Sequence, residues 1–281
     1  MIPIFLKNKP VSRWHILCVI VLFLNLISCD SEKIATNLDN KIKIISLAPH
    51  LTDLTQSAGA INNLVGVVSY ADSTTSEFDD IQIVGDAFKL DYESIIALKP
   101  DYILSWKGGT PIFVIEKLKS LNFNLIETEI NTLADIPKTI AQIASLTNTH
   151  DDANKNIMLF NEKLTELKNQ NHQRQSTFIE TYNKPLYTVS AKHWMSEAAS
   201  ICGYENIFQN MSQLSATVTL EAVISKNPQS IINISPNTDE QWQQWQDLAA
   251  VKNKQIITIS PDYFSRPSMQ LLKGIAILCD F

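Results

Sequence analysis

One long amphipathic helix in the middle of the chain constrains the fold more than any other feature. Within residues 151–172, apolar residues recur at spacings of four and three, which places them in one stripe along a helix. They are Ala153, Ile157, Phe160, Leu164 and Leu167. A helix of about 22 residues is roughly 33 Å long, the diameter of a small domain. The pattern predicts a rigid bridge, because a flexible linker would not carry such a stripe.

Short apolar runs on both sides of this helix predict the strands of α/β lobes. Three runs precede it, at 41–47, 101–106 and 123–127, and three follow it, at 185–190, 230–235 and 255–260. Helix-like stretches separate the runs, which is typical of largely parallel sheets covered by helices. We therefore expect an α/β protein with two Rossmann-like lobes, at 41–150 and 175–281, bridged by one long helix at 151–174.

One segment occurs in similar form in both halves, which supports the assignment of two related lobes. Residues 91–104 and 219–232 each contain a helix-capping residue, a glutamate two positions later, a short apolar helix, a proline and a strand. The glutamates are Glu93 and Glu221, and both fall in the first turn of the expected helix. Two interpretations remain open: they stabilise the helix dipole, or they present matching charges to one symmetric partner.

The start of the chain predicts an export signal. A few basic residues precede an apolar run at 16–24, which is shorter than the roughly 20 residues of a membrane span and has the size of a signal-peptide core. The segment 26–29, Leu-Ile-Ser-Cys, resembles a bacterial lipobox, in which the cysteine becomes the lipidated first residue of the mature chain. We expect a signal peptide at 1–28 and a tether at 29–40, lipidated at Cys29.

Lipidation would anchor a periplasmic protein to a membrane. Asp30, directly after the lipobox cysteine, resembles the signal that keeps enterobacterial lipoproteins on the inner membrane. We therefore expect an anchor in the inner membrane, with an uncleaved anchor helix or ordinary cleavage as the alternative. With Cys18 removed and Cys29 lipidated, Cys202 and Cys279 remain. In an oxidising compartment such a pair predicts a disulfide, although two buried free thiols are the alternative.

Composition excludes several function classes. The formal net charge is −6 and no stripe of Lys and Arg occurs, which argues against a nucleic-acid partner. None of the seven glycines forms a dinucleotide-binding fingerprint or a P-loop. The five histidines are scattered, without the spacing of a zinc site. No nucleophile elbow or paired-acid motif indicates an enzyme.

Eight segments spread over both halves match a known family. They are 44–54, 58–60, 65–72, 95–101, 106–109, 202–208, 227–229 and 262–267. On these segments the chain, over about residues 42–280, resembles the cobalamin-binding proteins of bacterial vitamin B12 importers. These belong to the class III periplasmic substrate-binding proteins, whose lobes are joined by one long helix. The segments 44–54 and 65–72 are fairly specific for the cobalamin branch, whereas 95–101 is shared with siderophore and haem binders.

The resemblance implies a ligand cleft between the lobes and delivery of the cargo to an ABC importer in the membrane. The residues that it places on the corrinoid are Tyr70, Trp106, Asp262, Tyr263, Phe264, Ser265 and Arg266. It implies that Glu93 and Glu221 pair with arginines of the permease. It also implies that Cys202 and Cys279 form the family disulfide.

Four further residues are candidates for the same cleft: His50, Phe88, His193 and Trp194. His50 lies at a strand-to-helix turn, His193 and Trp194 follow a strand, and Phe88 stands beside Ala87 in a first-lobe loop. Open α/β sheets place ligands at the carboxyl ends of their strands, and aromatic walls suit a large, partly apolar disc with a rim of amides. Each of the four could instead pack in the core or belong to a turn. The chain departs from the family at Ala87 and near Ser215, where relatives carry tryptophans.

We therefore expect a monomeric, non-enzymatic binding component of an ABC importer, with cobalamin as cargo and with no cofactor or resident metal. A ferric siderophore or haem is the alternative cargo, although Arg266, the only arginine among the cleft candidates, favours an uncharged ligand rim. A metal-ion binder would bring His50 and His193 together. An exported enzyme would instead use Glu93 and Glu221 as acid and base, facing each other within roughly 5–10 Å.

Overall fold

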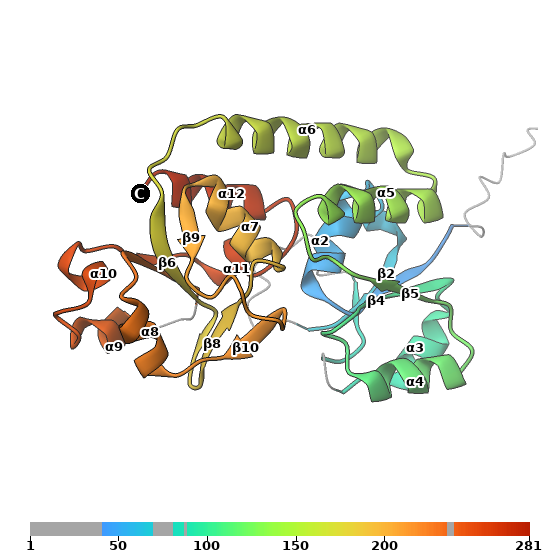
Figure 1. Ribbon diagram of the computed structural model, residues 1–281. Helices are drawn as coiled ribbons and strands as arrows, with labels where there is room; N and C mark the ends of the chain where they lie inside the picture. Colours follow the sequence, from blue (N-terminus) through green and yellow to red (C-terminus); the bar gives the residue numbers. More distant parts are fainter. Residues whose placement is uncertain (1–40, 70–80, 87–88, 235–238) are drawn as a thin grey trace, which may run out of the picture. The chain divides into compact units, whose positions relative to one another are not determined.

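The computed structural model describes residues 41–69, 81–86, 89–234 and 239–281 (Figure 1). Residues 42–281 form one unit, which contains all the helices and strands described below. The export signal, lipidation at Cys29 and the ligand contacts expected of Tyr70 and Phe88 lie outside the described residues.

The first lobe is built on a sheet of five parallel strands in the order β3-β2-β1-β4-β5. The strands are β1 (Ile44–Ser46), β2 (Leu64–Val67), β3 (Gln82–Ile83), β4 (Tyr102–Trp106) and β5 (Leu125–Thr128). The central strands β1 and β4 are fully buried over Ile44, Ile45, Ile103 and Leu104, because helices cover both faces of the sheet. Strands β2 and β3 lie on one side of β1, and β4 and β5 lie on the other. The order of the strands therefore reverses between β1 and β4, which is a topological switch point.

Helices of the first lobe begin and end at residues that favour those positions. They are α2 (Pro49–Ser57), a short 3₁₀ helix (Ile61–Asn63), α3 (Tyr92–Leu98), α4 (Ile112–Ser120) and α5 (Asp135–Thr147). Helix α2 starts with a proline, whose fixed φ suits the first helical position. The Asp91 carboxylate caps α3 by accepting a hydrogen bond from Ser94 N over 3.0 Å, as the repeated segment predicts.

The bridging helix is present as α6 (His150–Lys168). Its buried residues are Ala153, Phe160, Leu164 and Leu167, which belong to the predicted stripe. Helix α6 packs on α5 of the first lobe and on α12 (Leu271–Cys279) of the second (Figure 1). It ends six residues before the predicted boundary at 174, because the stripe ends at Leu167 and the residues that follow are polar.

The second lobe contains a parallel sheet and a small antiparallel one. The parallel sheet has the order β12-β11-β6-β9, formed by β6 (Gln175–Glu180), β9 (Tyr204–Asn206), β11 (Ser230–Asn233) and β12 (Ile256–Thr258). The predicted strand at 185–190 instead joins an antiparallel sheet, as β8 (Leu186–Val189) between β7 (Tyr182–Asn183) and β10 (Ser215–Thr217). The two lobes and their bridging helix confirm the predicted fold class.

Short helices surround the parallel sheet of the second lobe. In addition to α12 they are α7 (Trp194–Ile201), α8 (Leu220–Lys226), α9 (Asp239–Gln243), α10 (Ala249–Lys252) and α11 (Pro261–Phe264). Trp242 of α9 is fully buried and packs edge-on against Phe178 of β6, with 5.7 Å between ring centroids. Its indole N–H donates a hydrogen bond to the buried Glu180 carboxylate over 2.6 Å, which satisfies both polar groups.

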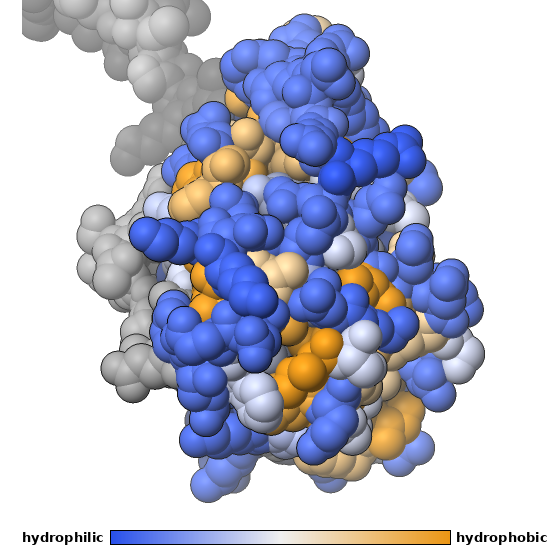
Figure 2. All heavy atoms as spheres, turned by 60° about the vertical axis from the view of Figure 1, so that its left-hand side comes forward, coloured by the Kyte–Doolittle hydropathy of each residue, from blue (hydrophilic) through white to orange (hydrophobic). Residues whose placement is uncertain are grey.

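Hydrophobic side chains on the second-lobe face gather in small, separate areas within a mostly hydrophilic surface (Figure 2). Among the described residues, none of the helices combines the length and the apolar character that crossing a membrane requires. The large apolar side chains of the described part are mainly inside, in three buried clusters. The largest of these clusters includes residues of both lobes and of α6, so the bridging helix shares its core with both.

Candidate ligand-binding site

His50 and Trp106 meet at the switch point of the first sheet. His50 lies in the first turn of α2, which follows β1, and Trp106 is the last residue of β4. Their rings contact each other edge-on, with 5.0 Å between centroids. Trp106 is 36% exposed, whereas His50 is only 3% exposed. Because ligands bind outside the carboxyl ends of strands at such a point, the indole is placed to form one wall of a site.

The loop after β4 shapes the surroundings of Trp106. The turn at 107–110 is closed by hydrogen bonds between the backbone of Trp106 and Thr110. Gly109 lies against the indole, and a Cβ atom built there would overlap the ring. Glycine is therefore required at this position for the observed orientation of Trp106.

His50 is a neutral imidazole in this environment. Burial, reinforced by the positive charge of Arg266, lowers the pKa of His50 to about 3. Its Nε2 atom is buried and has no hydrogen-bond partner in the described part of the chain. The imidazole that contacts the Trp106 ring edge-on is therefore uncharged.

The second lobe contributes the loop that follows β12. Helix α11 lies in this loop, and the Asp262 carboxylate forms an ion pair with the Arg266 guanidinium over 2.8 Å. Both side chains are partly exposed, and Ser265 is exposed. The ring of Tyr263 is partly exposed and lies 5.8 Å from the Lys273 ammonium. This loop thus exposes part of an ion pair without net charge, formed by Asp262 and Arg266, together with the ring of Tyr263.

Charges of the second lobe act on two residues of α2, one of which the sequence analysis missed. Burial raises the pKa of the Asp53 carboxyl, one turn after His50 on α2, above its ordinary 3.8, and the positive charge of Arg266 opposes this rise. The Arg266 charge acts on both His50 and Asp53, which brings the predicted residues His50 and Arg266 into one electrostatic cluster. The spacing of Asp53 from His50, three residues on one helix face, was the signal available in the sequence.

Trp194 and Phe264, which the sequence analysis placed on the ligand, lie inside the second lobe. Their exposed fractions are 2% and 0%, and their rings pack 6.5 Å apart between centroids. They offer almost no surface to a ligand and support the loops from within. His193 is the N-cap of α7, where its Nδ1 accepts a hydrogen bond from Met195 N over 3.1 Å, and burial lowers its pKa to about 4.

Glu93 and Glu221 occupy equivalent places in the two lobes. Glu93 is in the first turn of α3 and Glu221 in the first turn of α8, and both are exposed. Neither carboxylate has an ion-pair partner in the part of the chain that the structure describes. In each lobe the helix lies on the side away from α6 (Figure 1). The two glutamates are therefore free to meet external positive charges.

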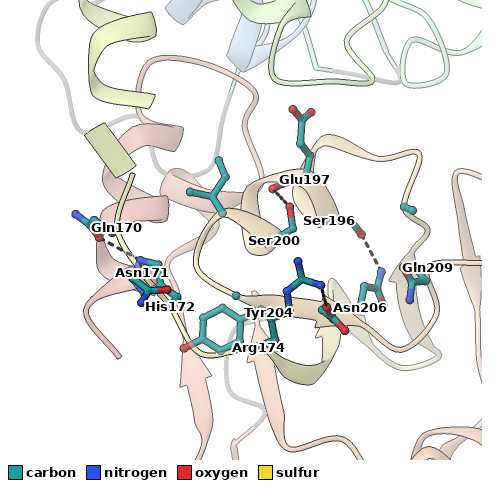
Figure 3. Close-up of a pocket in the computed structure, with 14 residues that line it drawn as sticks. Gln170, Asn171, His172, Arg174, Ser196, Glu197, Ser200, Tyr204, Asn206 and Gln209 are labelled. Carbon is teal, nitrogen blue, oxygen red and sulfur yellow. Dashed lines mark hydrogen bonds and ion pairs between the residues drawn. The ribbon is translucent and has the colours of Figure 1, made fainter. Parts of the chain in front are cut away.

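A separate polar cavity of about 700 Å³ lies at the end of α6 in the second lobe (Figure 3). Most of its polar side chains are already paired with one another. Arg174 forms an ion pair with Glu205 over 3.1 Å, and Asn206 donates a hydrogen bond to Ser196 over 2.8 Å. None of the predicted site residues lines this cavity. Its lining is mostly polar, whereas a large, partly apolar ligand needs mainly apolar and aromatic walls.

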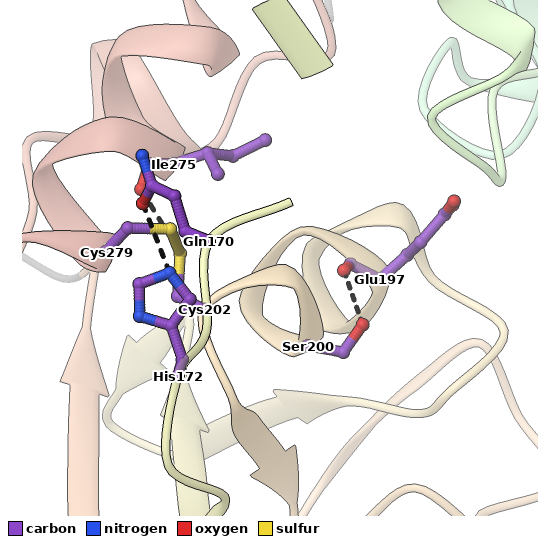
Figure 4. Close-up of a disulfide and its surroundings, with 7 residues drawn as sticks. All are labelled: Gln170, His172, Glu197, Ser200, Cys202, Ile275 and Cys279. Carbon is purple, nitrogen blue, oxygen red and sulfur yellow. Dashed lines mark hydrogen bonds between the residues drawn. A yellow bond between two sulfur atoms is a disulfide. The ribbon is translucent and has the colours of Figure 1, made fainter. Parts of the chain in front are cut away.

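The predicted disulfide between Cys202 and Cys279 is present close to this cavity (Figure 4). It joins the end of α7 to the end of α12. Helix α12 also packs on the bridging helix, so the disulfide ties that contact to the rest of the second lobe. In the described residues, no group of three or more metal-ligating side chains is close enough to hold an ion.

Comparison with known proteins places this architecture in one family. The chain is 30% identical over 243 residues to the vitamin B12-binding protein of Vibrio parahaemolyticus, which covers 85% of this chain and 88% of that protein. The crystal structure of the periplasmic vitamin B12-binding protein of Vibrio cholerae matches with a TM-score of 0.76 at 30% identity, covering 85% of this chain and 96% of that one.

A haem-binding protein shares the fold at lower identity. The periplasmic haem-binding protein of Vibrio cholerae matches with a TM-score of 0.71 at 16% identity, covering 85% of this chain and 98% of that one. The sequence model of the family described as periplasmic binding protein matches residues 44–263, from β1 to α11. That match spans both lobes and the bridging helix, and the chain belongs to the periplasmic binding protein family.

Proposed function

We propose that this protein is the substrate-binding component of an ABC importer and that it captures cobalamin between its lobes. The observation that carries the proposal is the 30% identity to a vitamin B12-binding protein over 243 residues, which span both lobes. The positions of Trp106 and Arg266 support it, since Trp106 is the last residue of a parallel strand in the first lobe and Arg266 lies in the loop after a parallel strand of the second.

The chemistry of the site suits a corrinoid. A corrinoid is a large, partly apolar disc with a rim of uncharged amides. The exposed part of Trp106 supplies an apolar wall, and the pair of Asp262 and Arg266 supplies an acceptor and donors for rim amides. Tyr70 and Phe88 are proposed as further aromatic contacts, and His193 and Ser265 as polar ones.

Charge balance favours cobalamin over the alternative cargoes. Haem and many ferric siderophores carry carboxylates or net negative charge, which an unpaired arginine would bind most strongly. Here the Arg266 guanidinium is already paired with Asp262 over 2.8 Å. An anion would have to compete with that carboxylate, whereas a neutral amide can bond to the remaining donors.

We further propose that Glu93 and Glu221 dock the loaded protein on two arginines of the permease. Their equivalent positions on α3 and α8 and their exposure support this role. The alternative of an acid–base pair is less suitable, because the two residues lie on helices of different lobes. We propose a monomeric, non-enzymatic binder in the periplasm, anchored to the inner membrane through a lipid on Cys29.

Calorimetric titration with cyanocobalamin tests the proposed cargo. A chain of residues 31–281 is suitable because residues 42–281 form a unit of their own. Haem and a ferric siderophore serve as controls on the same preparation. One-to-one binding of cyanocobalamin with a Kd in the micromolar range or tighter is expected. Heat with a control ligand and none with cyanocobalamin would keep the transport role and refute the cargo.

A further inference from the structure

A hydrogen bond joins the two lobes at the first turn of α7. The Glu197 carboxylate of the second lobe accepts this bond from the backbone N–H of Leu133 in the first lobe, over 2.8 Å. Leu133 is fully buried in the cluster that includes residues of both lobes, whereas Glu197 is partly exposed. Figure 4 shows the Glu197 side chain extending from α7 away from the disulfide. A side chain of one lobe is thus bonded to a backbone anchored in the core of the other.

The backbone N–H of Leu133 belongs to an ordered turn between β5 and α5. The Asp135 carboxylate accepts hydrogen bonds from Thr132 N over 2.9 Å and from Asn131 N over 3.2 Å. These two amides are therefore bonded within the first lobe, and the next amide along the chain, that of Leu133, bonds to Glu197. The turn presents this donor from a backbone that its own lobe already holds in place.

The same turn is connected to Trp106, the proposed wall of the ligand site. The Asn131 side-chain amide donates to the Glu129 carboxylate over 3.1 Å, and the Lys107 ammonium donates to the same carboxylate over 2.7 Å. Lys107 directly follows Trp106, and its backbone N–H donates to the carbonyl of Thr128 over 2.9 Å. Side-chain and backbone bonds thus join the loop after β5 to the loop after Trp106.

On the second lobe, α7 packs against the loop that carries Arg266. Trp194, three residues before Glu197, lies against Phe264 of α11, with 6.5 Å between ring centroids. Arg266 follows Phe264 by two residues. The Ser200 hydroxyl donates to the carbonyl of Glu197 over 2.7 Å, a bond within α7 that does not involve the carboxylate. Glu197 therefore lies on the helix that supports the second wall of the site.

We propose that Glu197 is a positioning residue, whose hydrogen bond with Leu133 fixes the loop after β5 to α7 and so sets the separation of Trp106 from Arg266. A single helix between two lobes permits them to tilt about it, and a second point of attachment restricts that motion. This inference rests on the proposed function for the identity of the ligand, but the bond between the lobes does not depend on that identity.

Distances between the lobes test the proposal without any ligand. Spin labels at Lys117→Cys on α4 and Ser225→Cys on α8 occupy exposed sites in different lobes. Pulsed electron spin resonance on the chain of residues 31–281 then gives the distribution of their separation. Glu197→Ala should broaden this distribution, because the acceptor for Leu133 N is lost. Glu197→Gln keeps a side-chain oxygen of the same reach and should leave the distribution as narrow as in the parent chain.

A matched control and a local probe separate this role from a general loss of structure. Glu205→Ala is the control, because the exposed Glu205 carboxylate pairs with Arg174 within the second lobe over 3.1 Å. Amide hydrogen exchange, followed by nuclear magnetic resonance, reports on the bond itself. The Leu133 amide should exchange faster in Glu197→Ala than in the parent chain, while the amides of β5 and α5 keep their rates. Faster exchange throughout β5 and α5 would overturn the positioning role.

Cyanocobalamin affinity provides a further readout. Loss of one net hydrogen bond corresponds to a Kd roughly three- to tenfold higher in Glu197→Ala, with recovery in Glu197→Gln. An unchanged distance distribution in Glu197→Ala would overturn the proposal, as would equal broadening in Glu205→Ala. A parent chain that binds no cyanocobalamin would refute the cargo, while the distances and the Leu133 exchange rate would still decide on the role of Glu197.

Discussion

Removal of the Trp106 indole should weaken cobalamin binding by about 30-fold. A tryptophan side chain buries up to about 250 Å², so the 36% of Trp106 that is exposed corresponds to about 90 Å² available to a ligand. At about 25 cal/mol per Å², covering that surface contributes about 2 kcal/mol, and Trp106→Ala should lose it. The corresponding change in Kd is about 30-fold.

The assay is calorimetric titration with cyanocobalamin, and two variants sharpen it. Gly109→Ala should also weaken binding, because a Cβ atom at Gly109 overlaps the indole and displaces it. Tyr182→Ala is the control, since this aromatic residue is 54% exposed on β7, outside the proposed site. An unchanged Kd in Trp106→Ala, or an equal loss in Tyr182→Ala, would refute the assignment of Trp106 as a wall of the site.

Three further predictions concern docking, the disulfide and pH. Glu93→Ala with Glu221→Ala should abolish cobalamin uptake by cells but leave the Kd intact; a weakened Kd would contradict the docking role. Cys202→Ala with Cys279→Ala should lower the free energy of unfolding by about 4–5 kcal/mol in urea titrations, because a cross-link spanning 77 residues is lost; an unchanged midpoint would refute this. The lowered pKa of His50, about 3 against 6.5, means that the unfolded chain binds the proton first, so stability falls on acidification. Between pH 7 and pH 5, the free energy of unfolding should fall by about 2 kcal/mol less in His50→Asn than in the parent chain. An equal fall in both chains would contradict the lowered pKa of His50.

The bridging helix could be predicted because its signal is local and periodic. Apolar residues from Ala153 to Leu167 recur at the spacing of an α-helix and form one stripe, which is visible within this segment alone. Strand β6 was missed because its first half, Gln175 to Thr177, is polar although it lies in the middle of the sheet. The hydroxyls of Thr177 and Ser230 on adjacent strands hydrogen-bond to each other over 2.7 Å, which permits their burial. Such pairing across the sheet has no signature within a single segment.

In the candidate site as well, features encoded within one segment could be predicted, whereas features that depend on contacts between distant segments could not. Trp106 could be placed because the end of a strand and the following glycines are visible in the sequence. The orientation of Trp194 could not, since its place after a strand does not show that the first turn of α7 points inward, where it is 2% exposed. Asp53 was missed because Arg266, whose charge acts on it, belongs to the other lobe.

A crystal structure of the protein with cyanocobalamin tests the central claim most directly. The account predicts one corrinoid between the lobes, with its ring system against Trp106 and with rim amides within hydrogen-bonding distance of Arg266. A corrinoid bound elsewhere, for example in the polar cavity beside Arg174, with no contact to Trp106 or Arg266, would contradict it.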